Sequence, residues 1–287
     1  MKINEEKGRL IVEWAVLVLI YAVLFFSNGF KNDLDVQRYE VESDKISHEI
    51  TLALISDLHS CDYGERQVSL LAATVYEEPD LVMLTGDIFD SELSDGKAET
   101  FIKEITERER CFYVTGDSEY ANGADAFNER MKMLEKYGVT RLSGDAQSVT
   151  INGQTINICG VDDPDASLLD GVTSFENQLE QVKKATDNGN FTVLLSHRPE
   201  YFADYAQKGF DLVLSGHANG GQWCLPPFIN GFYAPDQGIL PRYTGGRLYV
   251  RDNTTMIVSR GLAKENLSVP RFYNPPEVVI IKLVKKQ

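Results

Sequence analysis

Five apolar runs in this sequence of 287 residues each end in a group of Asp, His or Asn side chains. The first run, Leu52–Ile55, leads directly to Asp57 and His59. Short apolar runs are typical of strands in a parallel sheet, because both faces of such a sheet are covered. Side chains two residues apart leave the same side of an extended chain, so Asp57 and His59 are expected to converge. A carboxylate and an imidazole in that arrangement suit a transition metal.

The same arrangement returns four more times downstream. The runs lie at residues 81–84, 111–114, 191–195 and 210–214, and the residues after them include Asp87, Asp117, His197, His217 and Asn219. Three of the four histidines in the chain, His59, His197 and His217, follow one of the five runs. Chance explains single positions but not this joint pattern. Open α/β sheets bind ligands at the carboxyl ends of their strands, which is where these residues are expected.

Charged or amphipathic segments separate the apolar runs. We expect helices near 64–77, 96–108, 123–137 and 174–187, and an Asn152-Gly153 turn indicates a hairpin within 139–160. Strands that alternate with helices in this way predict an α/β fold built on parallel strands.

The charge of the chain restricts its partners. With 28 Lys and Arg against 43 Asp and Glu, the formal net charge is -15. Such a surface repels nucleic acid, and it would repel a phosphate substrate unless metal cations intervene. The four cysteines are widely spaced and form no Cys-x-x-Cys pair, so neither a zinc ribbon nor a dense disulfide framework is expected.

An apolar run at residues 10–26, interrupted only by Glu13, has about the minimum length of a membrane span. Lys2, Lys7 and Arg9 precede it, and the positive-inside rule then keeps the N-terminus cytoplasmic. We therefore expect a cytoplasmic segment 1–9, a single-pass cell-membrane anchor 10–27, a spacer 28–48 and an extracytoplasmic domain 49–287. A cleaved signal peptide is the alternative, since residues 27–29 supply small side chains near a cleavage position.

Five ordered motifs carry a family resemblance. They are Asp57-x-His59, Gly86-Asp87-x-x-Asp90, Gly116-Asp117-Ser118-Glu119, His197 and Gly216-His217-x-Asn219. In order and spacing they resemble the motifs of the calcineurin-like metallophosphoesterases, over about residues 50–284. The resemblance is greatest to a membrane-anchored or exported bacterial branch that also carries Ser-Arg-Gly-Leu, here Ser259 to Leu262. It implies a four-layer α/β/β/α sandwich with a two-metal centre.

The resemblance also implies a role for each motif residue. Asp57, His59 and Asn219 would bind one divalent ion, and Asp117, His197 and His217 would bind the other. Asp87 would bridge the two ions, which would be Mn, Fe, Zn or similar. The implied reaction is hydrolysis of a phosphomonoester or phosphodiester by a bridging hydroxide. Lipids and envelope components are among the candidate substrates.

This sequence departs from the family pattern at three positions. Asp117 replaces Asn, Ser118 replaces the catalytic His, and Asn219 replaces the last metal-binding His. The amide oxygen of Asn219 is a poor substitute for imidazole, so its site is expected to be weaker. Serine cannot protonate a leaving group at neutral pH, and general acid catalysis typically contributes about 10²–10⁴-fold in rate. The alternative function is therefore a catalytically impaired paralogue that binds metal or phosphate without turnover.

Further residues near the motifs are weaker candidates. Asp90 could orient a metal-binding imidazole. The others, which could line the substrate pocket, are Glu119, Asp163, Arg198 and Arg260, the arginines as bidentate partners of phosphate. A surface or structural role is the alternative for each of them.

Overall fold

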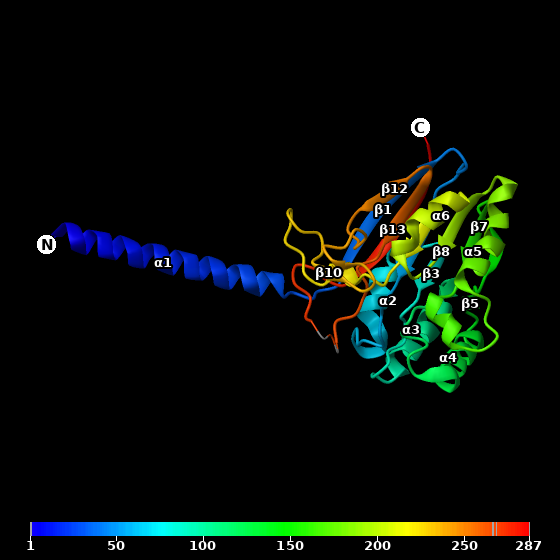
Figure 1. Cartoon of the computed structure of the whole chain (residues 1–287), viewed down its shortest axis with the longest axis horizontal. Coiled ribbons are helices and arrows are strands. Elements are labelled where there is room, and N and C mark those ends of the chain that lie inside the picture. The colour runs from blue at the N-terminus through cyan, green and yellow to red at the C-terminus, as the bar shows by residue number, and fades with distance from the viewer. Residues whose placement is uncertain (1, 266, 268, 287) are drawn as a thin grey trace.

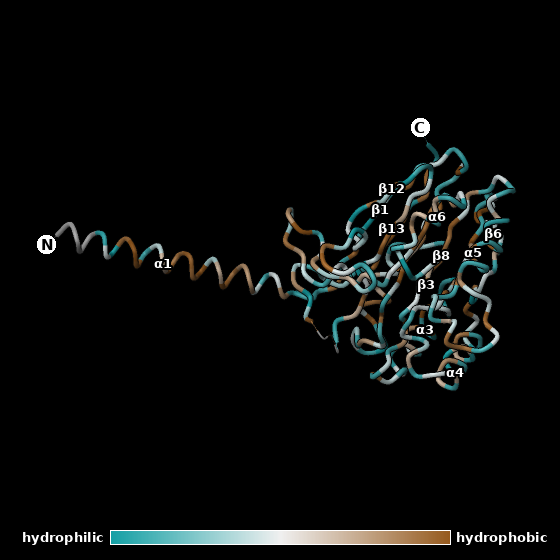
Figure 2. Tube along the Cα trace, in the orientation of Figure 1, coloured by the Kyte–Doolittle hydropathy of each residue, from teal (hydrophilic) through white to brown (hydrophobic). Residues whose placement is uncertain are grey.

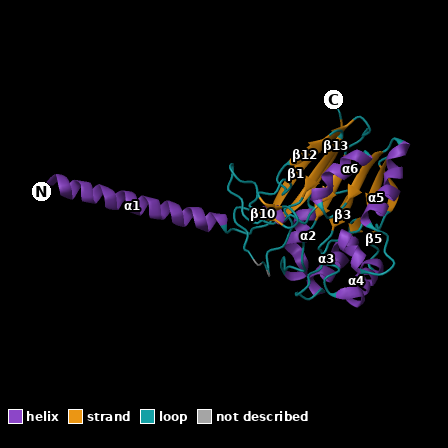
Figure 3. Ribbon diagram, in the orientation of Figure 1, coloured by secondary structure: helices purple, strands orange, loops and turns teal. Residues whose placement is uncertain are grey.

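Two six-stranded sheets pack face to face and helices cover their outer faces (Figures 1 and 3). The computed structural model describes residues 2–265, 267 and 269–286. The first sheet runs in the order β1 (Asp35–Ser43), β14 (Glu277–Lys285), β2 (Ile50–Ile55), β3 (Leu81–Thr85), β4 (Cys111–Val114) and β5 (Thr140–Arg141). The second runs in the order β12 (Leu248–Arg251), β13 (Thr254–Val258), β9 (Leu212–Ser215), β8 (Phe191–Leu195), β7 (Gln154–Gly160) and β6 (Asp145–Ile151).

The helices form the two outer layers. Those that pack on the first sheet are α2 (Val68–Val75), α3 (Gly96–Thr106) and α4 (Gly123–Lys136). Those that pack on the second sheet are α5 (Phe175–Lys183) and α6 (Phe202–Lys208). The remaining elements are the helix α1 (Lys2–Gly29), the small hairpin of β10 (Tyr233–Ala234) and β11 (Gly238–Ile239), and the 3-10 turns η1 (Glu65–Gln67), η2 (Pro164–Leu168), η3 (Lys184–Asn188), η4 (Pro199–Tyr201) and η5 (Asn219–Gly221).

Strand β2 shows how the sequence produces these layers. Alternate residues point to opposite faces of a strand. Leu52 and Leu54 enter the core between the two sheets, whereas Ala53 and Ile55 pack against the helical layer. Every residue of β2 is buried, which explains its unbroken apolar run. The predicted four-layer α/β/β/α sandwich is confirmed.

The strands that precede the predicted ligands run parallel within each sheet. Strand β2 pairs in parallel with β3, and β3 with β4. In the second sheet β8 pairs in parallel with β9. The ends of β8 and β3 meet between the sheets, because His197 Nδ1 lies 2.7 Å from Thr85 O. Both sheets therefore deliver their strand ends to one place.

The segment interpreted as a spacer contains a strand of the first sheet. Strand β1 pairs in parallel with β14, from Asp35 opposite Glu277 to Ser43 opposite Lys285. Only Val41 of β1 is buried. An edge strand with mixed polar side chains lacks the apolar pattern of a central strand, so the sequence resembles a linker.

Helix α1 projects from the domain and is apolar along most of its length (Figures 1 and 2). Within the described residues it alone is long and apolar enough to cross a membrane, over the 23 residues Lys7–Gly29. The most apolar stretch of this helix is not buried against the rest of the chain. At 1.5 Å per residue this span is about 34 Å long, enough for a hydrocarbon core of about 30 Å. Its end packs on the domain, where the Phe25 and Phe272 rings lie 5.6 Å apart.

Candidate metal centre

The side chains predicted to bind metal meet between the two sheets. Asp87 Oδ2 lies 3.3 Å from His59 Nε2 and 3.5 Å from His197 Nε2. Asp117 Oδ1 lies 3.4 Å from His197 Nε2 and 3.0 Å from His217 Nδ1. Asp87 thus lies between the imidazoles of His59 and His197.

Each of the three histidines presents one ring nitrogen to these carboxylates and uses the other elsewhere. His197 Nδ1 faces Thr85 O, which only accepts hydrogen bonds, so Nδ1 carries the proton and Nε2 the lone pair. The corresponding contacts of the other two are His59 Nδ1 to Asp90 Oδ2 at 3.1 Å and His217 Nε2 to Asp236 Oδ2 at 2.9 Å, the latter nitrogen also lying 3.0 Å from Arg198 Nη1. Oxygen acceptors that fix the tautomer are the usual partners of metal-binding histidines.

Two buried atoms in the middle of this cluster, His197 Nε2 and Asp117 Oδ1, make no hydrogen bond of good geometry to any described residue, although they lie 3.4 Å apart and Asp117 Oδ1 lies 3.0 Å from His217 Nδ1. A buried polar atom without a partner costs about 1–3 kcal/mol, which indicates a ligand that is not part of the chain. Among the described residues, three sets of three side chains bring ligand atoms within 4.8 Å of one another, namely Asp117, His197 and His217, then Asp57, Asp87 and His197, and also Glu200, His217 and Asp236. Imidazole and carboxylate ligands suit Zn, Fe or Mn, so these residues fit a divalent ion.

The charges of the cluster also favour a cation. Burial lowers the pKa of His197, but the carboxylates of Asp87 and Asp117 outweigh burial and raise it well above its usual value. Burial raises the pKa of Asp87, but His197 and His59 outweigh burial and hold it well below its usual value. Protons and divalent ions compete for such ligands, so metal binding here is expected to release protons.

Backbone strain is concentrated at the same residues. Asp57, His59, Asp87, His217 and Asn219 have φ between 46° and 65°. Left-handed backbone costs a residue other than glycine about 1–2 kcal/mol, and such strain clusters at functional sites.

Two motif glycines make room for the cluster. A Cβ atom on Gly116 would lie 2.2 Å from Asp87 Oδ1, and one on Gly216 would lie 1.8 Å from Ser56 Oγ. Neither position can accept a side chain while the neighbouring carboxylate and hydroxyl stay in place.

Asn219 is turned away from the orientation that a metal ligand needs. Its Oδ1 lies 3.2 Å from Arg271 Nη2, and its Nδ2 lies 3.5 Å from Asp57 Oδ1. Arginine only donates hydrogen bonds and an ionised carboxylate only accepts them, so these neighbours fix the orientation of the amide. The amide group beside Asp57 is then a donor, which cannot bind a metal. At this position the residues do not fit the ligand set that the family pattern implies.

Arg271, which no sequence signal indicated, is almost completely buried at 1% exposure. Besides Asn219, its guanidinium donates to Ala263 O at 2.6 Å and Arg260 O at 2.7 Å, all neutral acceptors. Burial lowers the pKa of Arg271, and the groups that oppose this effect include Asp57. A permanent cation of the chain therefore lies beside Asn219 and near Asp57.

Ser118 and Glu119 support the backbone of the centre. The Ser118 N–H donates to Asp87 Oδ1 at 2.9 Å. The carboxylate of Glu119 is fully buried and accepts four backbone N–H groups, those of Asp87, Ile88, Phe89 and Gly116, at 2.6–3.2 Å. Glu119 holds the turn that carries Asp87 and does not line the pocket.

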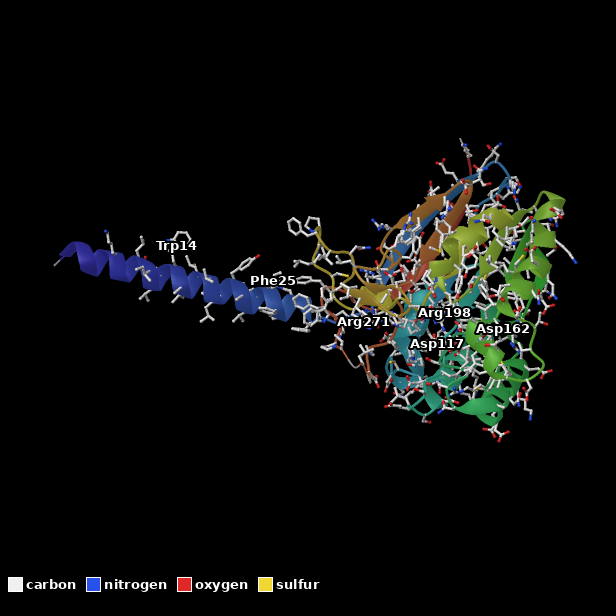
Figure 4. The ribbon with its side chains drawn as sticks, in the orientation of Figure 1. Trp14, Phe25, Asp117, Asp162, Arg198 and Arg271 are labelled. Carbon is white, nitrogen blue, oxygen red and sulfur yellow. The ribbon has the colours of Figure 1, made fainter. Side chains whose placement is uncertain are left out.

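A cavity of about 560 Å³ opens beside Asp117 and His217. Arg198 lies on its wall and near Asp117, at the centre of the domain (Figure 4). Its Nε and Nη2 atoms bond the buried Asp163 carboxylate at 2.6 and 3.0 Å, and Nη1 bonds Asp236. Arg198 is thus held by carboxylates of the chain.

The remaining candidates divide between the centre and the periphery. Asp90 contacts His59, where it could orient the imidazole. Arg260 does not line the cavity, because its guanidinium pairs with Glu277 at 2.6 Å and with Asp35 at 3.4 Å. Asp236 and Glu200 also line the cavity, and sequence reasoning missed both, although Glu200 lies only five residues after the end of β8.

Comparisons with known proteins agree with this geometry. Residues 50–219 match the family model of the calcineurin-like phosphoesterases. An uncharacterized metallophosphoesterase of Aquifex aeolicus is 31% identical over 260 residues, which cover 88% of this chain and 93% of that protein. A Bos taurus transmembrane protein with metallophosphoesterase domain is 28% identical over 203 residues, which cover 64% of this chain and 45% of that protein.

Among solved structures, Haemophilus influenzae NAD nucleotidase superposes with a TM-score of 0.49 at 15% identity. The match covers 76% of this chain and 46% of that one, so the chain spans about half the length of that protein. With the family model matched over more than half of its residues, and with the Aquifex aeolicus relative matched almost end to end, the chain belongs to the calcineurin-like phosphoesterase family.

Proposed function

We propose that this chain is a metal-dependent phosphoester hydrolase held in a membrane by its N-terminal helix. The observation that carries the proposal is the pair of buried atoms His197 Nε2 and Asp117 Oδ1, which make no hydrogen bond to any described residue, together with the contact to Thr85 O that sets the tautomer of His197. Groups arranged in this way are preorganised for a metal ion, because their other hydrogen bonds are made within the chain.

We expect the two ion sites of the centre to differ in their affinity for a divalent ion. Asp87, Asp117, His197 and His217 form the intact half, which we expect to hold one divalent ion firmly. In the half that contains Asp57, the Arg271 guanidinium and the turned amide replace part of a second ion site. Divalent ions held in this centre would supply Lewis-acid stabilisation of the phosphoryl oxygens and an activated water nucleophile.

Among the described residues of the five motifs, none is a free general acid. Ser118 replaces the imidazole of the family, and His59, His197 and His217 each use their second nitrogen in a contact with an oxygen. A leaving group that the motif residues do not protonate departs most readily as a stable anion, so we propose substrates with stable leaving anions. The same observation favours the second candidate function, binding of metal or phosphate without turnover.

The membrane part of the proposal rests on α1. Its exposed apolar residues and the basic residues before it favour a single-pass anchor with the domain on the extracytoplasmic side. The Tyr273 hydroxyl donates to Phe25 O at 2.9 Å, so the helix end is bound to the domain, which favours a retained anchor over a cleaved signal peptide. Protease added to intact cells should digest the domain, and full protection would refute this orientation.

The catalytic proposal is tested with the full chain purified in detergent. Metal analysis should find bound divalent ion, and aryl phosphomonoesters or phosphodiesters such as p-nitrophenyl phosphate should be hydrolysed. His197→Gln should lose both properties, whereas His48→Gln, at an exposed histidine outside the cluster, should keep them. Metal without hydrolysis would favour the binding function, and absence of metal from the unaltered chain would refute the centre.

A further inference from the structure

The segment 223–240 is an exposed apolar loop in an otherwise acidic chain. It contains a single charged residue, Asp236, in a protein of which 25% is charged. Its exposed large apolar side chains are Trp223, Leu225, Phe228, Phe232, Tyr233, Ile239 and Leu240. Isolated exposed apolar residues are normal, but a contiguous group of this kind marks a surface that is covered by something else.

The loop is ordered and presents these side chains in a fixed way. Tyr233 lies opposite Ile239 in the β10–β11 hairpin, so both side chains are on the same face. Ile239 is 70% exposed although its backbone is paired. The Asn230 side chain donates to Thr244 Oγ1 and to Gly245 O, which ties the loop to the domain. Its exposure is therefore not a consequence of an unfolded segment.

The loop begins where α1 leaves the domain. The Trp223 ring lies 5.7 Å from the Phe272 ring, and Phe272 in turn contacts three rings at the end of the helix, those of Phe25, Phe26 and Phe30. Figures 1 and 2 show β10 and the neighbouring apolar loop beside this end of α1. The apolar surface of the helix thus continues into the loop.

We propose that the 223–240 loop is a second membrane contact, which lies in the headgroup region of the bilayer that α1 crosses. The inference rests on the proposed anchoring. A bilayer is the occupant that this surface fits, because α1 brings lipid to its border, and Trp and Tyr are enriched at membrane interfaces. Apolar side chains of peripheral segments enter the headgroup boundary in the same way.

This contact would also determine the kind of substrate. Asp236, at the tip of the same hairpin, lies 2.9 Å from His217 and bonds Arg198, so the loop forms one wall of the cavity at the metal centre. With the loop on the bilayer, the cavity opens near its surface. The substrate class is then an amphiphilic phosphoester whose apolar part stays in the membrane.

The two tryptophans of the chain allow a direct test. The full chain is reconstituted into phosphatidylcholine vesicles whose acyl chains carry bromine, a fluorescence quencher, either near the headgroup or near the bilayer centre. In Trp14→Phe the remaining Trp223 reports on the loop, and in Trp223→Phe the remaining Trp14 reports on α1. We expect Trp223 to be quenched most by bromine near the headgroup and to be protected from iodide in the water.

Failure of the inference and failure of the anchoring give different results. A Trp14 that bromine does not quench would refute the membrane anchor, and the loop contact with it. A quenched Trp14 together with a Trp223 open to iodide would overturn the loop contact and leave the anchor. A Trp223 protected from both quenchers would also overturn it, because a protein surface, and not lipid, would then cover the loop.

A matched pair of variants tests the assignment further. Ile239→Ser, in the Trp14→Phe background, should reduce quenching of Trp223, whereas Leu168→Ser should not, although both residues are 70% exposed. Ile239→Ser should also slow hydrolysis of an alkyl p-nitrophenyl phosphodiester embedded in the vesicles more than hydrolysis of soluble bis(p-nitrophenyl) phosphate. Equal effects of the two variants on quenching would overturn the contact, and equal slowing of both substrates would overturn the substrate class.

Discussion

Glu119→Gln tests whether one buried carboxylate holds the turn that carries Asp87. Oε2 of Glu119 accepts the N–H groups of Asp87 at 2.9 Å and Gly116 at 2.6 Å. Oε1 accepts those of Ile88 at 2.9 Å and Phe89 at 3.2 Å. All four N–H groups come from the two turns that follow β3 and β4, so the carboxylate joins these turns beneath the metal centre.

The size of the effect follows from these four bonds. Glutamine has nearly the same shape, but its NH₂ group would point a donor at two backbone donors. Each buried N–H without an acceptor costs about 1–3 kcal/mol, so we expect unfolding to become easier by about 2–6 kcal/mol. That is a large part of the roughly 5–15 kcal/mol that stabilises a typical domain. Asp87, whose φ is +52°, would also lose the bond that holds its strained backbone.

The assay compares stability with metal affinity. Urea unfolding followed by fluorescence gives the free energy, and calorimetric titration with Mn²⁺ gives the affinity. The control variant is Leu134→Ala, at a core residue of α4 that is 1% exposed. Truncation of a buried leucine typically lowers the free energy of unfolding by about 2–5 kcal/mol, and here it should do so without weakening metal binding. The reasoning is refuted if Glu119→Gln loses less than about 0.5 kcal/mol. It is also refuted if the variant binds metal as Leu134→Ala does.

Three more substitutions address the metals and the missing acid. Asp87→Asn should lose metal from both halves of the centre, because its carboxylate lies between them; an unchanged metal content would contradict this. Asn219→His alone should not increase the metal content while Arg271 remains, whereas Asn219→His with Arg271→Met should; a gain in the single variant would exclude the effect of Arg271. Ser118→His should accelerate alkyl phosphoesters more than aryl ones, by up to about 10²–10⁴-fold. Equal acceleration of both ester classes would show that the new imidazole does not act by protonating the leaving group.

The parts of this protein that its sequence predicts are those with local signals. Strand β2 is fully buried and is therefore largely apolar in sequence, and the predicted metal ligands Asp57 and His59 follow it within a few residues. The same holds for Asp87 after β3 and His197 after β8. Because each ligand is attached to the end of a buried strand, predicting the strand also locates the ligand.

The parts that escaped prediction depend on contacts between distant, irregular segments. Arg271 meets Asn219 from 52 positions away, and Glu119 reaches the Asp87 N–H from 32 positions away. Strand β1 was missed for a related reason: its polar residues are explained only by its place at a sheet edge beside β14. No periodicity marks such residues, so only the packed structure separates a buried arginine from a surface one.

Three consecutive residues connect helix α1 with the candidate metal centre. Arg271 donates to Asn219, the Phe272 ring lies 5.6 Å from the Phe25 ring, and the Tyr273 N–H donates to Gly29 O at 2.6 Å. A rotation or displacement of α1 would therefore act, through at most two peptide units, on the guanidinium beside the amide of Asn219. Removing α1 would leave this segment without its neighbours, and metal content measured on the isolated domain would then differ from that of the full chain. For this reason the full chain is the material on which the stoichiometry of the centre has to be measured.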